Sequence, residues 1–341
     1  MSLAAALADI LERHVGGRGA AGVAVAISDG AEPVTAWVSR SDAQEPAYLA
    51  YSITKTFLAV LVLLLRDEGR LGLDDRLARW APDLPQGERI TLYQLLNHSA
   101  GVPDYGGLPA YHEDVRALPS LPWSFERFVA ETLGKGLSFE PGSGWAYSNP
   151  GYMLLRHVAE RAGGRSFAAL VAERIARPLS LARTFVPESV RDLAVLTPAP
   201  SRALAQDGAA RDVRDVYHPG WVSHGVVAST PSEISRFFAA LFGGRLVSAA
   251  SLRELTTVVP VPNAPAHWVR PGYGLGIMGD ADSRWGMLWG HNGEGPGYTA
   301  SAFHAPRLGG VSACAMCAFE GDARAEQIVF ATLDALASAY A

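Results

Sequence analysis

Lysine is almost missing from this chain. Of its 29 basic residues among 341, only Lys55 and Lys135 are lysine, and the rest are arginine. Arginine stays protonated and cannot act as a base, whereas a desolvated lysine can lose its proton. Lys55 lies in an apolar segment, so it is the first residue for which the composition suggests a chemical role.

An excess of positive charge is also missing. The net charge is −5, and the sequence contains no run of basic residues. A mildly acidic protein has no electrostatic reason to bind nucleic acid or anionic lipid, so we expect neither as a partner. Hydrophobic residues make up 49% of the chain and charged residues 18%, which is enough apolar material for a large core.

Long apolar runs are absent. The longest is Phe57–Leu65, whereas a membrane-spanning helix needs about 20 residues. The N-terminal segment 1–14 has neither a basic start nor a long apolar stretch, and it carries Asp9, Glu12 and Arg13. It predicts an amphipathic surface helix rather than a secretory signal, and therefore a cytoplasmic protein that does not bind membranes.

Cysteine is scarce, with only Cys314 and Cys317. Their C-x-x-C spacing is found in redox pairs and in zinc sites. The surrounding segment, Val311–Phe319, reads as a strand, and residues three apart on a strand point to opposite faces. No second Cys/His pair is present to complete a metal site. We therefore predict no redox pair and no metal site at these cysteines, and we expect no cofactor.

The two ends of the chain predict strands, and the middle predicts helices. Strand patterns are Gly22–Ser28, Pro33–Ser39, Gly274–Gly279, Gly286–Gly290, Tyr298–His304 and Val311–Phe319, and the first two read as a hairpin with a turn at Asp29–Gly30. The segment Tyr51–Gly69 predicts a helix that is apolar on nearly all sides, and Asp322–Tyr340 predicts a final helix. Between Leu71 and Pro219 helical stretches alternate with loops rich in proline and glycine.

This order predicts an α+β fold. It combines an antiparallel sheet of five or more strands, flanked by N- and C-terminal helices, with an inserted all-helical domain. We expect residues 1–72 and 220–341 to form the sheet domain, and residues 73–219 to form the helical one.

Ser52 and Lys55 form an S-x-x-K pattern at the start of the predicted apolar helix. Residues three apart share one face of a helix, so the hydroxyl and the amine can meet. The helix start stabilises negative charge, and the nine apolar residues that follow would lower the pKa of the lysine. A serine helix cap followed by an ordinary lysine would give the same pattern.

Two further patterns follow in order. Tyr147-Ser148-Asn149 comes before a predicted helix, and Gly290-His291-Asn292-Gly293-Glu294 opens a glycine-rich segment. A phenol beside an ammonium can relay a proton. Glycines allow a strand edge to be approached closely by another backbone. Each pattern alone also fits a plain helix start or a glycine-rich turn.

Taken together, S-x-x-K, then Y-x-N, then H-x-G resemble the serine β-lactamase and penicillin-binding-protein-like superfamily, most closely its class C-like branch. That branch includes class C β-lactamases, DD-peptidases, D-aminopeptidases and family VIII esterases. The resemblance extends over roughly residues 20–335 and includes Leu95–Gly101, Phe139–Gly142 and Ser229–Pro231. It implies a β-lactamase/transpeptidase-like fold.

The resemblance also implies roles for individual residues. Ser52 would be the acylated nucleophile, Lys55 its general base or proton shuttle, and Tyr147 the group that protonates the leaving group and activates the incoming acceptor. Asn149 would bind the substrate carbonyl or hold Lys55. His291 would tune Tyr147 electrostatically. Backbone N–H groups of Ser52 and Glu294 would form the oxyanion hole.

The segment after His291 departs from the family pattern, because Asn292 replaces the usual threonine and Glu294 follows Gly293. A glutamate facing the cleft would repel a substrate carboxylate, so we expect a small neutral or cationic substrate. We also expect Asn292, Gly293, Trp289, Trp221 and Tyr105 to contact that substrate. His98 and His224 are interpreted as structural loop histidines.

These features predict a serine hydrolase that acts through an acyl-enzyme, and we expect an esterase or amidase first. The alternatives are a D-amino-acid peptidase, a class C-like β-lactamase, and an acyltransferase or peptide cyclase that uses the same acyl-enzyme. A non-catalytic penicillin-binding sensor or scaffold fits least. The expected partner is a small ester, amide or peptide substrate, and the oligomeric state is left open.

Overall fold

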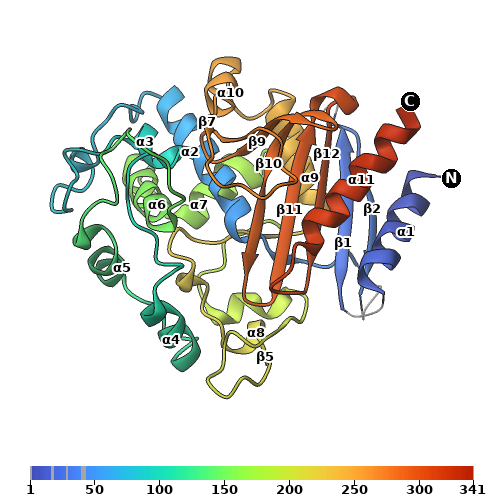
Figure 1. Ribbon diagram of the computed structural model, residues 1–341, viewed down its shortest axis with the longest axis horizontal. Coiled ribbons are helices and arrows are strands. Elements are labelled where there is room, and N and C mark those ends of the chain that lie inside the picture. The colour runs from blue at the N-terminus through green and yellow to red at the C-terminus, as the bar shows by residue number, and fades with distance from the viewer. Residues whose placement is uncertain (1, 17–18, 28–29, 40–43, 341) are drawn as a thin grey trace.

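An eight-stranded antiparallel sheet forms the centre of the structure, a computed structural model that describes residues 2–16, 19–27, 30–39 and 44–340 (Figure 1). Its strand order is β2-β1-β12-β11-β10-β9-β8-β7, so the N-terminal hairpin pairs with the last strand of the chain. This confirms the predicted α+β fold and a sheet built from both ends of the chain. Ser28, Asp29 and Met1 lie outside the described residues.

The strands of the sheet are β1 (Ala21–Ile27), β2 (Val34–Val38), β7 (Val259–Pro260), β8 (Pro271–Tyr273), β9 (Met278–Ser283), β10 (Gly286–Gly295), β11 (Tyr298–Ala305) and β12 (Val311–Cys317). Two short pairs lie outside it: β3 (Tyr48–Leu49) with β6 (Ala228–Ser229), and β4 (Pro200–Ser201) with β5 (Arg211–Asp212). The helices are α1 (Leu3–Val15), α2 (Thr54–Asp67), α3 (Leu92–Leu96), α4 (Pro109–Ala117), α5 (Phe125–Glu131), α6 (Asn149–Gly163), α7 (Phe167–Val171), α8 (Val213–Val216), α9 (Pro231–Phe242), α10 (Ala249–Leu255) and α11 (Arg324–Tyr340).

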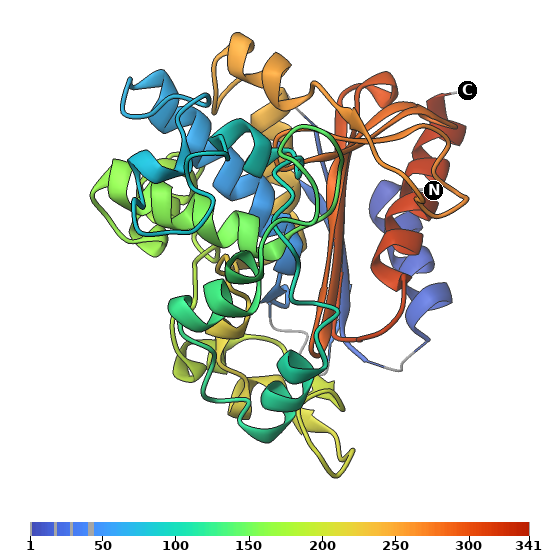
Figure 2. The same cartoon turned by 60° about the vertical axis from the view of Figure 1, so that its left-hand side comes forward.

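Helices cover both faces of the sheet. The terminal helices α1 and α11 pack against one face, and α9 packs against the other, where α2 also lies (Figure 2). Alternation along β12 divides its side chains between the two layers, because successive residues of a strand point to opposite faces. Cys314 belongs to the core on the α9 side and Cys317 to the core under α11, as the sequence predicted.

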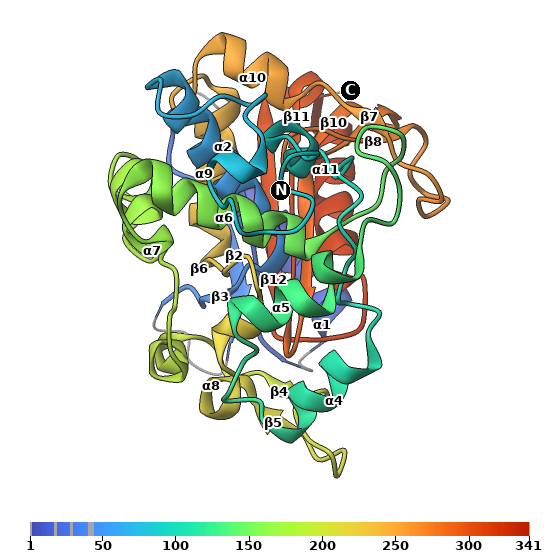
Figure 3. The same ribbon diagram turned by 90° about the vertical axis from the view of Figure 1, so that its left-hand side faces the viewer.

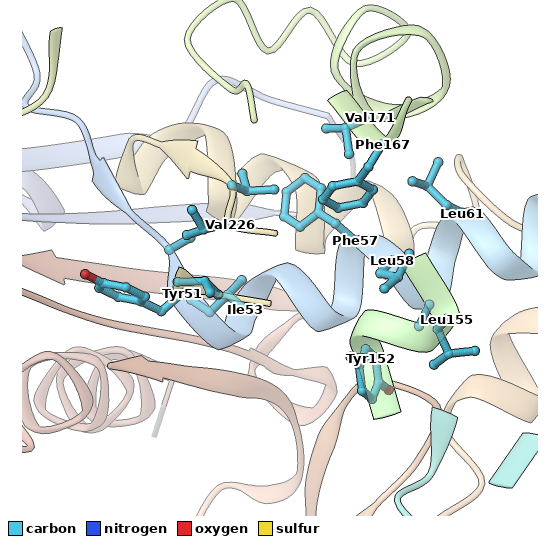
Figure 4. Close-up of a cluster of buried hydrophobic side chains, with 14 of the residues drawn as sticks. Tyr51, Ile53, Phe57, Leu58, Leu61, Tyr152, Leu155, Phe167, Val171 and Val226 are labelled. Atoms are coloured by element: carbon cyan, nitrogen blue, oxygen red, sulfur yellow. The ribbon is translucent and has the colours of Figure 1, made fainter. Parts of the chain in front are cut away.

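Helix α2 runs through the middle of the larger core. Eleven of its side chains are buried, because almost every position is apolar. Figure 4 shows Phe57, Leu58 and Leu61 of α2 surrounded by side chains of α6 and α7. The rings of Phe57 and Phe237 stack with their centroids 3.8 Å apart, which attaches α2 to α9.

The helical segments between α2 and α9 lie on one side of the sheet, in front of it in Figure 3. The proposed boundaries of this part at residues 73 and 219 stay a prediction. No helix in the described residues is long and apolar enough to cross a membrane.

One predicted strand is wrong. Residues 274–277 form a loop between β8 and β9 rather than the strand expected over Gly274–Gly279. Gly276 has φ +71°, and a Cβ there would lie 2.6 Å from the Lys55 carbonyl oxygen. Its own carbonyl accepts a hydrogen bond of 2.7 Å from the Thr56 hydroxyl. Close packing against α2 therefore replaces strand pairing at this point.

Candidate active site

Ser52 lies in a single 3₁₀ turn, Tyr51–Ile53, immediately before α2. The residues that flank this turn, Ala50 and Thr54, both form hydrogen bonds with Val227. The Ala50 N–H donates to the Val227 carbonyl at 2.8 Å, and the Val227 N–H donates to Thr54 Oγ1 at 2.8 Å. Tyr51 has φ +43°, a left-handed conformation that is costly for a large side chain. The fold thus imposes a sharp entry into α2 at Ser52.

Strand β10 supplies the opposite wall. It pairs with β9 only as far as Gly290, so residues 291–295 have a free edge, and this edge lies against the Ser52 turn. A Cβ at Gly293 would lie 2.2 Å from the Ala50 oxygen and 3.2 Å from the Ser52 nitrogen. The glycine-rich sequence therefore allows the backbone of β10 to touch the turn that carries Ser52. This proximity suits the predicted oxyanion hole, which stays a prediction.

Lys55 lies one helical turn after Ser52 and is fully buried. Its Nζ atom donates to Ser52 Oγ at 3.1 Å and to Asn149 Oδ1 at 2.7 Å. The ammonium is removed from water, and this desolvation sets the pKa of Lys55 well below its ordinary value, although Asp104 acts in the opposite direction. A lowered pKa makes the neutral amine easier to form, and a neutral amine can accept the proton of the Ser52 hydroxyl.

Tyr147 and Asn149 reach the same point from the start of α6. Ser148 caps this helix, and its hydroxyl accepts from the Gly151 N–H at 3.0 Å. The Tyr147 ring centroid lies 4.7 Å from Lys55 Nζ. Burial raises the pKa of the Tyr147 phenol far above its usual value, although a hydrogen bond to Ser52 opposes the rise. Tyr147 is therefore a protonated phenol, suited to donate a proton.

His291 lies in β10 and is a neutral imidazole. Burial, and after it the charge of Lys55, lowers the pKa of His291 to about 3. Its Nδ1 faces the Asn292 carbonyl at 2.5 Å, and its Nε2 faces the Tyr273 hydroxyl at 2.9 Å. The His291 and Tyr147 rings have centroids 6.3 Å apart. Any influence on Tyr147 must come from a neutral, hydrogen-bonded ring rather than from a positive charge.

A pocket of about 470 Å³ opens beside Ser52. Of the residues predicted to form the site, Ser52, Asn149, Glu294 and Tyr105 line it. Glu294 is exposed, so the carboxylate lies at the pocket wall. The other charged residues of the lining are Arg116, from α4, and Glu320, which follows β12.

Three residues predicted to contact substrate lie elsewhere. The Asn292 side chain donates to Glu326 on α11 at 2.7 Å, on the far face of the sheet, because neighbours in a strand alternate between faces. Trp221 is buried behind Tyr111 and donates to the Pro119 carbonyl at 2.9 Å. Trp289 packs in the core, against Gly279. The structure thus corrects the assignment of these side chains to the substrate pocket, whereas Gly293 contributes its backbone at the Ser52 turn.

Two close neighbours of the candidate catalytic groups were not predicted from the sequence. His224, interpreted above as a structural histidine, has Nε2 3.3 Å from Lys55 Nζ. Asp104 accepts from the Asn149 N–H at 2.8 Å and lies near enough to raise the pKa of Lys55. No local motif marks either residue, because only the tertiary fold brings them to α2.

Comparisons with known proteins agree with this geometry. A family model described as Beta-lactamase matches residues 7–331. Penicillin-binding protein 4* of Bacillus subtilis is 31% identical over 73% of this chain and 55% of its own length. Esterase EstB of Burkholderia gladioli is 31% identical over 38% of this chain and 36% of its own length. The chain thus spans only part of these two relatives.

A solved structure extends the match over nearly the whole chain. The D-stereospecific amidohydrolase from a Streptomyces species superposes with a TM-score of 0.82 and is 30% identical, covering 96% of this chain and 98% of the other. Its fold, like that of this protein, is β-lactamase/transpeptidase-like. Together with the family match over residues 7–331, this shows that the chain belongs to the Beta-lactamase family, which includes esterases, amidases and penicillin-binding proteins.

Proposed function

We propose that this protein is a serine hydrolase that forms an acyl-enzyme on Ser52 and cleaves esters or amides of small neutral or cationic substrates. The observation that carries the proposal is the buried Lys55 amine, which lies 3.1 Å from Ser52 Oγ beside a pocket of about 470 Å³. Membership of a family that contains esterases and amidases supports it.

The geometry supports the following order of proton transfers. Ser52 Oγ attacks the substrate carbonyl carbon while its proton moves to the neutral Lys55 amine. The carbonyl oxygen becomes an oxyanion, for which the N–H groups of Ser52 and Glu294 are the candidate donors. The bond to the leaving group then breaks, and Tyr147 gives that group a proton, which Lys55 restores. In the second half of the reaction, water attacks the acyl carbonyl carbon and the proton transfers run in reverse. The proton of water passes by way of Tyr147 and Lys55 to Ser52 Oγ, and the carboxylic acid leaves.

The opposite shifts of the two pKa values support Lys55 rather than Tyr147 as the base of acylation. Burial lowers the pKa of Lys55 and raises the pKa of Tyr147. Both directions favour a neutral amine with a protonated phenol over an ammonium with a phenolate. We therefore assign the base of acylation to Lys55 and the acid to Tyr147.

The charges of the pocket favour substrates that carry an amine. Glu294 and Glu320 contribute two carboxylates to the lining, against one guanidinium from Arg116. The Glu320 carboxylate already accepts from the N–H groups of Arg202 and Gly297, whereas the Glu294 carboxylate has no hydrogen bond or ion pair within the described part of the chain. The free carboxylate of Glu294 can therefore pair with an ammonium group of a substrate.

Turnover and intact mass, measured together, test the activity. Wild type and Ser52→Ala are incubated with p-nitrophenyl esters, a D-Ala-containing peptide amide and a cephalosporin. We expect ester or amide turnover that Ser52→Ala abolishes, with an acyl mass on wild type alone. Fast cephalosporin hydrolysis would instead identify a β-lactamase. A stable adduct without turnover would indicate a transferase or cyclase, and the absence of both turnover and adduct with every probe would refute the proposal.

Glu294→Gln tests the preference for an amine. We expect kcat/KM for amino-acid esters with a free amine to fall about two- to fivefold, the size of a solvent-exposed charge pair, with no change for their N-acetyl forms. Glu88→Gln, at an exposed site away from the pocket lining, is the matched control. An equal effect on charged and acetylated substrates would refute recognition of the amine.

A second candidate is hydrolysis of D-amino-acid amides. The solved structure that covers nearly all of this chain is that of a D-stereospecific amidohydrolase. Rates for paired D- and L-amino-acid amides would decide, with a clear D preference expected under this proposal.

A cytoplasmic location, predicted from the N-terminal sequence, stays a proposal that fractionation of native cells would test.

A further inference from the structure

Lys55 Nζ has three hydrogen-bond partners, and one of them is not explained by the family resemblance. The partners are Ser52 Oγ at 3.1 Å, Asn149 Oδ1 at 2.7 Å and His224 Nε2 at 3.3 Å. Lys55 is fully buried, and in the described residues the hydrogen-bond partners of its Nζ atom are these three neutral groups rather than a carboxylate. The third contact is made by a residue 169 positions away in the chain.

His224 is held firmly at this position. It is 1% exposed, and it contributes to the lining of the Ser52 pocket. Its loop is tied to the nucleophile turn by the hydrogen bonds between Val227 and both Ala50 and Thr54. Gly225, which follows it, has φ +83°, and the Gly225 N–H closes a turn onto the Val222 carbonyl at 2.8 Å. The backbone therefore presents the imidazole to Lys55 without depending on substrate.

Among the described residues, the His224 imidazole has no other hydrogen-bond partner. Its Nδ1 atom is buried and has no partner within the residues that the structure describes. The group that pairs with Lys55 is therefore Nε2 alone. Burial, with Lys55 as the next cause, lowers the pKa of His224 well below the ordinary value, so the ring is neutral and Nε2 can accept a hydrogen bond.

The count of protons explains why a third partner matters. A neutral amine has two N–H groups and one lone pair, and an ammonium has three N–H groups. If Asn149 Oδ1 and His224 Nε2 accept the two N–H groups, the lone pair is left for the Ser52 hydroxyl proton. After transfer, the three N–H groups of the ammonium match the three acceptors. Without His224, the amine can rotate its lone pair away from Ser52.

We propose that His224 is a positioning residue for the acylation step, which accepts one N–H of Lys55 through Nε2 and thereby directs the lysine lone pair to Ser52 Oγ. The catalytic role of His224 rests on the proposed function, whereas the contact between His224 and Lys55 is independent of it. It requires the tautomer with hydrogen on Nδ1, because a hydrogen on Nε2 would compete with Ser52 for the lone pair.

Other charged and titratable groups also face this pair. Tyr147 and Tyr152 present ring faces to Lys55, with centroids 4.7 and 5.6 Å from Nζ. Asp104 acts on Lys55 from the loop before α4. His98, His291 and Arg156 act on His224, and both of these histidines have pKa values lowered by burial and are neutral. Substitution of His224 alone leaves these groups in place, so its effect on Lys55 can be isolated.

The scarcity of lysine makes a direct measurement possible. Protein labelled with ¹³C at lysine Cε has only two signals, from Lys55 and from Lys135, which is exposed and pairs with Glu131. Lys135→Arg removes the second signal and assigns the first. The pH titration of Lys55 is then recorded in wild type, His224→Gln, His224→Leu and His224→Glu. This readout requires no substrate, so it is independent of the proposed activity.

Each variant has a distinct expected result. Gln keeps an acceptor, so the pKa of Lys55 should stay within about 0.3 units and kcat/KM within about threefold. Leu removes the acceptor, so the pKa should fall and the acylation rate should drop at least about tenfold. Glu places a carboxylate beside the ammonium, so the pKa should rise by about one unit or more, and the acid limb of kcat/KM should move to higher pH by the same amount.

Two results would overturn the inference. One is a Lys55 titration that is unchanged in His224→Glu, because the two side chains would then not be in contact. The other is equal loss of acylation in His224→Gln and His224→Leu, because His224 would then only fill space. If His224→Leu does not fold, the Lys55 titrations of His224→Gln and His224→Glu still test whether the two side chains are in contact. If wild type acylates nothing while His224→Glu shifts Lys55, the proposed function fails and the contact stands.

Discussion

Gly293→Ala tests whether the backbone of β10 positions the nucleophile. The added Cβ would lie 2.2 Å from the Ala50 oxygen, about 1.2 Å inside ordinary van der Waals contact. Backbone cannot rotate out of the way as a side chain can, so either β10 or the Ser52 turn must move by about that distance. A displacement of about 1 Å at a reacting group costs on the order of 100-fold in rate.

We therefore expect kcat/KM for a p-nitrophenyl ester to fall about 100-fold in Gly293→Ala. The overpacking should cost about 1–3 kcal/mol of stability, so the protein should still fold and should melt a few degrees lower. Activity and the melting curve are measured on the same preparation. Gly107→Ala is the matched control, because a Cβ there meets nothing within 4 Å and φ is not in the left-handed region.

Wild-type turnover by folded Gly293→Ala would refute this reasoning, because the Ser52 turn would then not depend on close approach by β10. Equal losses in Gly293→Ala and Gly107→Ala would also refute it, since a general effect of adding a methyl group would explain both.

Further predictions concern the titration of the site and the cysteines. Lys55→Met should lower the rate of Ser52 acylation by about 10²–10⁴-fold without unfolding the chain, as measured by intact mass against time. In wild type, kcat/KM should rise with pH through the lowered pKa of Lys55, because only the neutral amine accepts the Ser52 proton; a rate that falls over this range would contradict the assignment. Asp104→Asn removes the charge that raises the pKa of Lys55, so the acid limb of kcat/KM should move to lower pH. Cys314 and Cys317 are buried, and burial raises the pKa of Cys317 to about 12, so the folded protein should not react with a thiol reagent at pH 8 until denaturant is added, and reductant should not change its activity.

Local patterns in the sequence were sufficient to predict which central side chains of the candidate site lie together. Ser52 and Lys55 meet because residues three apart share a helix face, and their hydroxyl and amine lie 3.1 Å apart in the structure. The Y-x-N pattern placed Asn149 at the first turn of α6, from which it reaches Lys55 at 2.7 Å. These contacts follow from motifs whose own secondary structure aims the side chains.

Predictions that depended on which face of a strand a residue occupies were less successful. Asn292 and His291 are adjacent in the sequence, yet Asn292 bonds to Glu326 on α11 while His291 lies among the groups near Lys55. The sequence placed both in one motif, but alternation in β10 separates them by the thickness of the sheet. The aromatic residues Trp221 and Trp289 were assigned to the pocket by type alone, and both are core residues.

The sequence by itself therefore determined the α+β fold class, the helix that carries Lys55 and starts beside Ser52, and the glycines that allow β10 to approach it, because these depend on local periodicity and backbone freedom. Only the tertiary structure decided that His224 and Asp104 lie near Lys55, that Glu294 lies at the pocket wall, and that the 274–277 segment is a loop. The reason is physical: these outcomes depend on packing between segments far apart in the chain, and no local pattern encodes which buried groups such packing brings into contact.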